Sequence, residues 1–73
     1  MSDLILMRVD FLKQFTKYII EMIGDEDIID YWLMYGVPDE ADDDILNEIA
    51  SNDDNWLSIV KAFSECCKMA DVI

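Results

Sequence analysis

Residues 24–54 read GDEDIIDYWLMYGVPDEADDDILNEIASNDD, and this stretch determines where the helices of the chain begin and end. Gly24 follows the last apolar residue of a helical pattern, where a left-handed helix terminus is expected. Asp25 can cap the next helix, because its carboxylate accepts hydrogen bonds from free backbone N–H groups in the first turn. Gly36 and Pro38 then end that helix, since proline cannot continue it.

Amphipathic patterns flank this stretch on both sides. Residues 3–23 place Asp10, Gln14, Lys17 and Glu21 at helical spacing, and apolar residues cover most of the remaining circumference. The apolar residues repeat with a period of about 3.6 residues, and no segment alternates apolar and polar residues as a half-buried strand would. The sequence therefore predicts an all-α fold in which residues 1–73 form one compact four-helix domain, with helices over residues 3–23, 25–35, 42–50 and 53–70.

The start and the apolar face of the last helix can also be predicted. Ser51 and Asn52 offer a new cap, and Ser51 with Asp54 resembles a capping box with Asp in place of Glu. The apolar face predicted from helical spacing comprises Trp56, Leu57, Val60, Phe63, Cys67 and Ala70.

The net charge of −12 is concentrated in the middle of the chain. The sequence has 17 acidic and 5 basic residues, and the basic residues lie in the first and last helices, where acids balance them. Residues 22–60 contain no base, and their acids are Asp25, Glu26, Asp27, Asp30, Asp39, Glu40, Asp42, Asp43, Asp44, Glu48, Asp53 and Asp54. Such a charge repels phosphate groups, so we expect no direct binding to nucleic acid or to an anionic membrane. A hydrophobic content of 53% excludes a disordered acidic tail.

Helix starts explain about half of these acids, because the helix dipole stabilises a carboxylate in the first turn. The dipole does not explain the like-charge pairs Glu40–Asp44 and Asp44–Glu48, since such pairs four residues apart destabilise a helix. The acids therefore form either a merely solvated face or a surface that meets a basic partner. For the second interpretation, the candidate partner-binding carboxylates are Asp39, Glu40, Asp42, Asp43, Asp44, Glu48, Asp53 and Asp54.

The segment over residues 28–35 reads IIDYWLMY, in which Asp30 is the only charged residue. One interpretation is a central core helix that the longer helices surround. The other is an exposed binding or dimer patch that includes Trp32 and Tyr35, because tryptophan and tyrosine are enriched at interface hot spots. The apolar excess of so short a chain also favours a homodimer.

The sequence lacks patterns of catalysis and of metal binding. Without histidine there is no ordinary base at neutral pH, and Gly24 and Gly36 are helix stops rather than parts of a phosphate loop. Residues 39–50 have the length of an EF-hand loop, but Ala41 and Ala50 stand where ligands belong. We therefore expect no enzymatic activity, no cofactor and no metal site.

The remaining signals concern the cellular compartment. Cys66 and Cys67 are adjacent, and a bridge between neighbours on a helix would be strained, so free thiols in a reducing cytoplasm are expected. The N-terminus lacks a secretory pattern, and no uncharged apolar run reaches the roughly 18 residues of a membrane helix. These features predict a cytoplasmic location, in the host cell if a phage encodes the chain.

In size, acidity and helical content, the chain resembles the small DNA-mimic inhibitors of phages and other mobile elements, namely anti-CRISPR and anti-restriction proteins. Residues 32–63, which begin WLMYGVPDEADDDILNEIAS, are also similar to short acidic proteins of Gram-positive bacteria and their mobile elements. The first resemblance implies a non-enzymatic inhibitor that binds the basic nucleic-acid-binding cleft of a nuclease or other effector.

The spacing of carboxylates agrees with this hypothesis. Glu40, Asp44 and Glu48 are each four residues apart, so on one helix they would form a row with a spacing close to that of phosphates along a strand. The alternative function is a helical protein-interaction or antitoxin-like regulatory module that binds through Trp32 and Tyr35.

Overall fold

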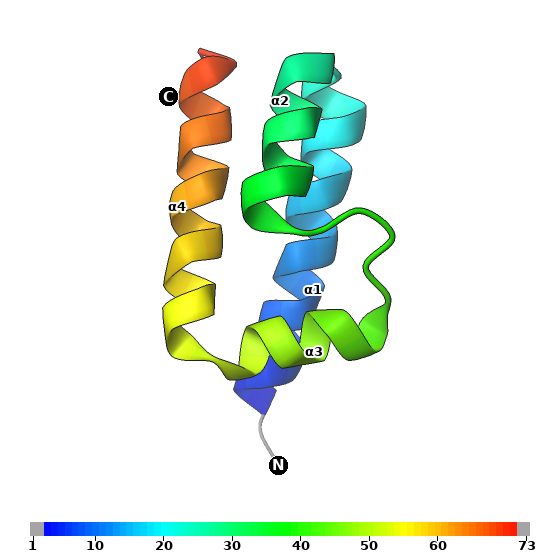
Figure 1. The fold of residues 1–73 in the computed structure, drawn as a ribbon, viewed down its shortest axis with the longest axis vertical. Helices are drawn as coiled ribbons and strands as arrows, with labels where there is room; N and C mark the ends of the chain where they lie inside the picture. The colour runs from blue at the N-terminus through cyan, green and yellow to red at the C-terminus, as the bar shows by residue number, and fades with distance from the viewer. Residues whose placement is uncertain (1–2, 72–73) are drawn as a thin grey trace.

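Four helices follow one another through residues 3–71, the part of the chain that the computed structural model describes (Figure 1). The elements are α1 (Asp3–Lys17), η1 (Tyr18–Ile23), α2 (Glu26–Tyr31), η2 (Trp32–Gly36), α3 (Asp43–Ser51) and α4 (Asp53–Met69). η1 and η2 are π-helical continuations of α1 and α2. The all-α four-helix domain predicted from the sequence is confirmed, with each predicted boundary close to the observed one.

The wide turns of η1 and η2 were not predicted. Each ends in a backbone hydrogen bond that spans five residues, from Gly24 N to Ile19 O and from Val37 N to Trp32 O, both 2.9 Å long. Gly24 adopts a left-handed conformation with φ +68°, as its position after the helix predicts.

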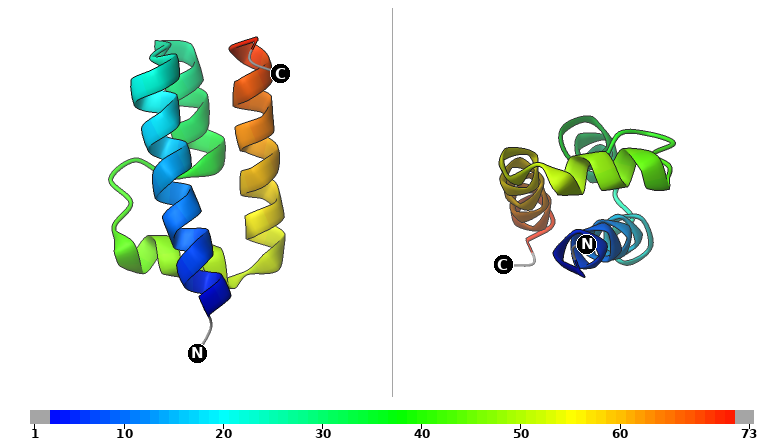
Figure 2. Two further views of the ribbon diagram at one scale, coloured as in Figure 1. Left: turned by 180° about the vertical axis from the view of Figure 1, so that it is seen from behind. Right: turned by 90° about the horizontal axis from the view of Figure 1, so that it is seen from below.

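Three of the four helices run side by side along the longest axis of the molecule. These are α1 with η1, α2 with η2, and α4, while α3 crosses one end of the group (Figures 1 and 2). The loop over residues 37–42 passes along the outside and leads from η2 to α3. The molecule measures 37 × 23 × 17 Å along its principal axes.

Side chains of Asp and Asn start the helices after the first. Asp25 accepts hydrogen bonds from two backbone N–H groups at the start of α2, and Asp42 accepts one from Ile45 N, 3.0 Å away. Asn52 caps α4 by accepting from Asn55 N at 3.0 Å. The predicted capping box is wrong, because the Ser51 hydroxyl donates backward to a carbonyl of α3.

An aromatic centre occupies the space between α1, η2 and α4, and comprises Phe15, Thr16, Trp32, Gly36 and Phe63. The Trp32 side chain is fully buried, and its indole N–H donates to the Thr16 hydroxyl at 2.9 Å. That hydroxyl in turn donates to Leu12 O at 2.8 Å, so the polar atoms of the centre are paired. The rings of Phe15 and Phe63 stack with centroids 4.2 Å apart.

The predicted apolar face of α4 is rotated relative to the observed one. The buried residues of α4 are Ile59, Ala62, Cys66 and Cys67, whereas the side chains of Leu57 and Val60 are 66% and 41% exposed. The cause is that α4 packs mainly against η2, with further contacts to α3 and α2, rather than centrally against α1. Helical spacing indicates an apolar side of a helix, but the neighbouring helix decides which edge of that side is covered.

Candidate partner-binding surface

The eight carboxylates predicted to bind a partner are all exposed, and they define what we call the acidic surface. They are Asp39 and Glu40 of the loop, Asp42, Asp43, Asp44 and Glu48 at or on α3, and Asp53 and Asp54 at the start of α4. The four other acids of the middle segment accompany the start of α2, at the opposite end of the molecule from α3 (Figure 1). The fold therefore divides the negative charge between two ends.

Two carboxylates of the acidic surface are paired with bases of α1. Lys13 Nζ lies 3.1 Å from Asp43 Oδ1, and Arg8 Nη1 lies 2.8 Å from Asp53 Oδ1. The sequence contains no base between residues 22 and 60, and these partners come from far along the chain. Charge counting along the sequence could not reveal them, because the pairs exist only once α3 has packed against α1.

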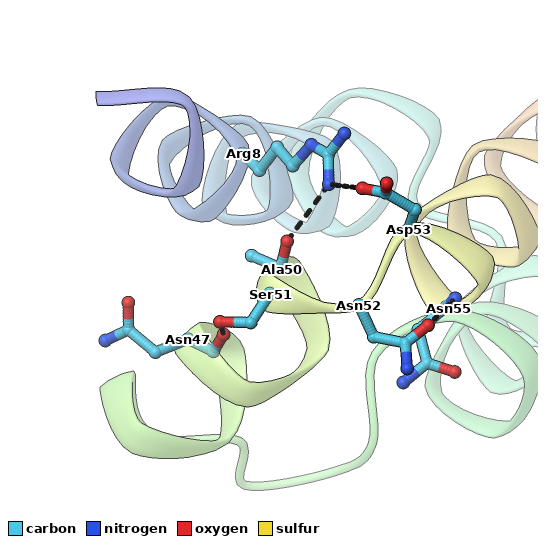
Figure 3. Close-up of polar contacts among 7 residues, drawn as sticks. All are labelled: Arg8, Asn47, Ala50, Ser51, Asn52, Asp53 and Asn55. Atoms are coloured by element: carbon cyan, nitrogen blue, oxygen red, sulfur yellow. Dashed lines mark hydrogen bonds and ion pairs between the residues drawn. The ribbon is translucent and has the colours of Figure 1, made fainter. Parts of the chain in front are cut away.

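Arg8 fixes the corner between α3 and α4 (Figure 3). The same Nη1 that contacts Asp53 donates to Ala50 O at 3.1 Å, a carbonyl in the last turn of α3. Such carbonyls lack partners within their own helix. The guanidinium also lies 5.2 Å from the ring centroid of Trp56, and the Arg8 side chain is only 15% exposed. Asp53 therefore contributes to the fold as well as to the surface charge.

The predicted row of Glu40, Asp44 and Glu48 is broken in the structure. α3 begins at Asp43, and Glu40 lies before it in a left-handed conformation with φ 60°. Glu40 therefore cannot continue the helical spacing. Asp44 and Glu48 remain one turn apart on α3, and both are exposed.

The other carboxylates of the acidic surface differ in whether they form hydrogen bonds or ion pairs. Asp42 is exposed but serves as the cap of α3. Of the eight carboxylates of the acidic surface, five take part in no ion pair and no side-chain hydrogen bond with the described residues: Asp39, Glu40, Asp44, Glu48 and Asp54. These five are the strongest candidates for contact with a basic partner, because binding breaks no existing interaction.

The aromatic segment does not form the predicted patch in full. Trp32 is 0% exposed, so the prediction that it contacts a partner is wrong, and the core interpretation holds for this residue. Its indole fills the space between η2, α1 and α4. Tyr35 and Met34 are 60% and 73% exposed, and Tyr35 packs against Tyr31 with ring centroids 4.7 Å apart. A smaller patch of Met34 and Tyr35 therefore remains available.

The two cysteines are buried thiols. Burial, together with the nearby Cys67 and Glu65, raises the pKa of the Cys66 thiol to about 11. Burial also raises the pKa of Cys67. Because the thiolate is the reactive form, both groups are poor nucleophiles at neutral pH. Among residues 3–71, no three Asp, Glu or Cys side chains converge to hold a metal ion.

A groove of about 490 Å³ lies between α1 and the loop. Leu12, Val37 and Leu46 line its apolar part, while Lys17 and Glu40 stand at its charged rim. The Thr16 hydroxyl, which also lines the groove, already bonds within the aromatic centre. The groove thus borders the acidic surface without adding a reactive group to it.

Comparison with known proteins returns no matching family model, no matching curated protein and no matching solved structure. What the molecule does has to be inferred from its own residues. None of the helices described over residues 3–71 is both long and apolar enough to span a membrane.

Proposed function

We propose that this protein is a non-enzymatic inhibitor whose acidic surface occupies the basic nucleic-acid-binding cleft of a nuclease or other effector protein. The observation that carries the proposal is the set of five exposed carboxylates, Asp39, Glu40, Asp44, Glu48 and Asp54, that the fold leaves without a partner. The location this implies is the cytoplasm, where bacterial nucleases of this kind meet DNA.

Charge geometry supports the proposal. Asp44 and Glu48 are separated by about 6 Å along the axis of α3, a distance close to the roughly 6–7 Å between phosphates of one strand. Arginine and lysine side chains that hold phosphates also bind carboxylates, often through two parallel hydrogen bonds. An acidic helix with this spacing can therefore compete with DNA in a basic cleft, including the channel or the PAM-reading arginines of a CRISPR nuclease.

The experiment that tests the proposal compares two triple variants with the same net charge. One is Asp44→Asn/Glu48→Gln/Asp54→Asn on the acidic surface, and its control is Glu26→Gln/Asp27→Asn/Asp30→Asn near the start of α2. Each immobilised protein is exposed to bacterial extract, and a nucleic-acid-binding protein captured by the unmodified chain is purified. Displacement of labelled duplex DNA from that protein is then measured by fluorescence anisotropy.

We expect the acidic-surface variant to lose inhibition by about tenfold or more, because each lost contact to a charged group weakens binding. The control should inhibit like the unmodified protein. Inhibition should also weaken by about tenfold or more between about 50 and 200 mM salt. Equal loss in both variants, or inhibition that does not depend on salt, would contradict the proposal.

The second candidate function is a helical interaction module that binds through Met34 and Tyr35. It is favoured by the exposure of these two apolar side chains next to each other at the end of η2. Tyr35→Ala separates the candidates, because it should abolish capture by the interaction module and leave inhibition by the acidic surface unchanged. The affinity of this module should depend weakly on salt, since its contact is apolar.

A further inference from the structure

One broad face of the molecule is formed by α1, η1 and α4, and no other helix described over residues 3–71 covers it (Figure 2, left). We call it the α1–α4 face. The two helices make few close backbone contacts with each other, and aromatic side chains bridge the space between them. Phe15 stacks on Phe63 and also lies 6.5 Å from Trp56, and Tyr18 meets Phe63 edge-on at 6.1 Å.

Apolar side chains on both sides of this bridge reach solvent. On α1 and η1, the exposed fractions are 53% for Leu4, 53% for Met7, 43% for Phe11 and 73% for Met22, and on α4 they are 66% for Leu57 and 41% for Val60. An open groove of about 380 Å³ lies at the η1 end of the face, lined in part by Phe15, Tyr18, Met22 and Phe63. Soluble monomers rarely leave so many large apolar side chains exposed in one region.

The spacing of these residues is that of helices that pack alongside other helices. On α1 and η1, Leu4, Phe11, Phe15, Tyr18 and Met22 occupy a pattern of alternating steps of three and four residues, interrupted once by Arg8. On α4, Trp56, Val60, Phe63, Cys67 and Ala70 follow the same pattern. Such seams are typical of four-helix arrangements, in which each helix contacts two neighbours.

Charge identifies which partner this face accepts. The net charge of α1 and η1 is zero, because over residues 3–23 three acids offset three bases: Asp3, Asp10 and Glu21 against Arg8, Lys13 and Lys17. On α4 (residues 53–69), Lys61 and Lys68 offset two of the three acids Asp53, Asp54 and Glu65, so this helix carries a net charge of −1. Two molecules of charge −12 repel each other through most of their surfaces, but the helices of this face carry only −1 of that charge. Of the acidic surface, only Asp53 and Asp54 lie on these helices, at the start of α4, and Arg8 pairs with Asp53.

We propose that a second copy of this chain packs against the α1–α4 face, so that α1 and α4 of both copies form a symmetric dimer interface. The size of the face agrees with this assignment. Seen down its shortest axis, the whole molecule measures 37 × 23 Å, and a face that follows its long helices has the dimensions needed for the about 800 Å² that each partner contributes to a stable interface. Gln14, Lys17, Ser64 and Lys68 then provide the polar rim that surrounds an apolar centre.

Sedimentation equilibrium or light scattering of two matched double variants tests the dimer. Met22→Glu/Leu57→Glu places charges on the α1–α4 face, at side chains that are 73% and 66% exposed. Met34→Glu/Tyr35→Glu places the same charges at side chains on η2 that are 73% and 60% exposed. Because all four side chains are largely exposed, neither variant disturbs the core, and circular dichroism confirms that both remain helical.

We expect the unmodified protein and the η2 control to form dimers at protein concentrations between about 1 µM and 1 mM. The α1–α4 variant should be a monomer, with an association constant reduced by about 100-fold or more. A monomeric unmodified protein over this whole range would overturn the proposal, as would an α1–α4 variant that stays dimeric. A loss of dimer in the control instead would place the interface at Met34 and Tyr35 and would also overturn it.

Salt separates this proposal from the proposed inhibition. Raising the salt concentration screens the repulsion between two copies of charge −12, so the dimer should become tighter. Inhibition through the acidic surface should become weaker under the same change. Failure of the dimer therefore leaves the inhibition result intact, and the converse also holds.

Discussion

The aromatic centre and the acidic surface are equally conspicuous in the sequence, but the fold uses them in opposite ways. In the aromatic centre, Trp32 is fully buried and its indole N–H is paired. On the acidic surface, side chains such as Asp44 and Glu48 are exposed and have no partner among the described residues. The difference shows that the aromatic residues determine the fold, while most of the acids are free for another role.

The largest effect is expected from Trp32→Ala in the aromatic centre. Removing a fully buried indole leaves a cavity and leaves the Thr16 hydroxyl oxygen without the donor it accepts from, which costs about 3–5 kcal/mol of unfolding free energy. Because a small domain has only about 5–15 kcal/mol of unfolding free energy, the variant should lose a large share of its stability. Urea unfolding followed by circular dichroism measures this, and a loss below about 1 kcal/mol would refute the role assigned to Trp32.

Gly36→Ala should also destabilise the aromatic centre, because a Cβ atom at Gly36 would lie 2.4 Å from Cε3 of Trp32. The buried ring has no room to move, and overpacking of this kind costs about 1–3 kcal/mol. Gly24→Asn is the control, since Gly24 needs only a left-handed conformation, which asparagine tolerates. Thermal unfolding should show a clear decrease for Gly36→Ala and a small one for Gly24→Asn, whereas equal decreases would contradict the steric argument.

These two glycines show what could be predicted from the sequence. Both were correctly predicted as helix ends, as were the cap at Asp25 and the all-α fold, because such signals depend on near neighbours in the chain. The contact between Gly36 and the Trp32 ring depends on the width of the π-turn, which no residue pattern indicated. The exposure of Leu57 also escaped prediction, because it depends on where α4 meets η2.

The same limit applies to the acidic surface. Its eight carboxylates could be listed from the sequence, but their division into paired and unpaired groups could not. Asp43 and Asp53 meet Lys13 and Arg8 only through packing of α1 against the α3–α4 corner. Glu40 lies outside the predicted row of carboxylates, because α3 starts three residues later than that row requires. Local rules predict which charges exist, and tertiary contacts decide which of them remain free.

Replacement of Arg8 should have an intermediate effect, because this residue connects the two regions. Arg8→Ala removes the contacts with Asp53, the Ala50 carbonyl and the Trp56 ring, and should cost about 1.5–3 kcal/mol. Lys13→Ala removes one exposed ion pair and should cost at most about 1 kcal/mol. Urea midpoints of the two variants give the comparison, and similar values would mean that Arg8 acts only through its charge.

Neutralising the acidic surface should change stability least among the substitutions. For Asp44→Asn/Glu48→Gln/Asp54→Asn we expect a change within about 0.5 kcal/mol. Removal of the like-charge pair Asp44–Glu48 offsets the loss of two carboxylates, Asp44 and Asp54, that the helix dipole stabilises in the first turns of α3 and α4. Asp42→Ala is the contrasting variant, since it removes a cap and should cost about 1 kcal/mol. If the triple variant is destabilised as much as Asp42→Ala, its acids contribute to folding and are not free for a partner.

The final prediction concerns Cys66, beside the aromatic centre, and the dependence of stability on pH above neutrality. Burial raises the pKa of its thiol from 9.0 to about 11, so the folded state holds the proton to higher pH than the unfolded state. The thiol therefore stabilises the fold fully below pH 9.0, and this contribution decreases as the pH rises to about 11. Cys66→Ala should lower stability through lost packing but should also flatten the decrease over this pH range. Urea unfolding of both proteins at several pH values gives the slope of the unfolding free energy against pH. The difference between the two slopes cancels the titration of lysines and tyrosines, which both proteins share. Identical slopes would show that Cys66 titrates as it does in water, in conflict with its full burial in the structure.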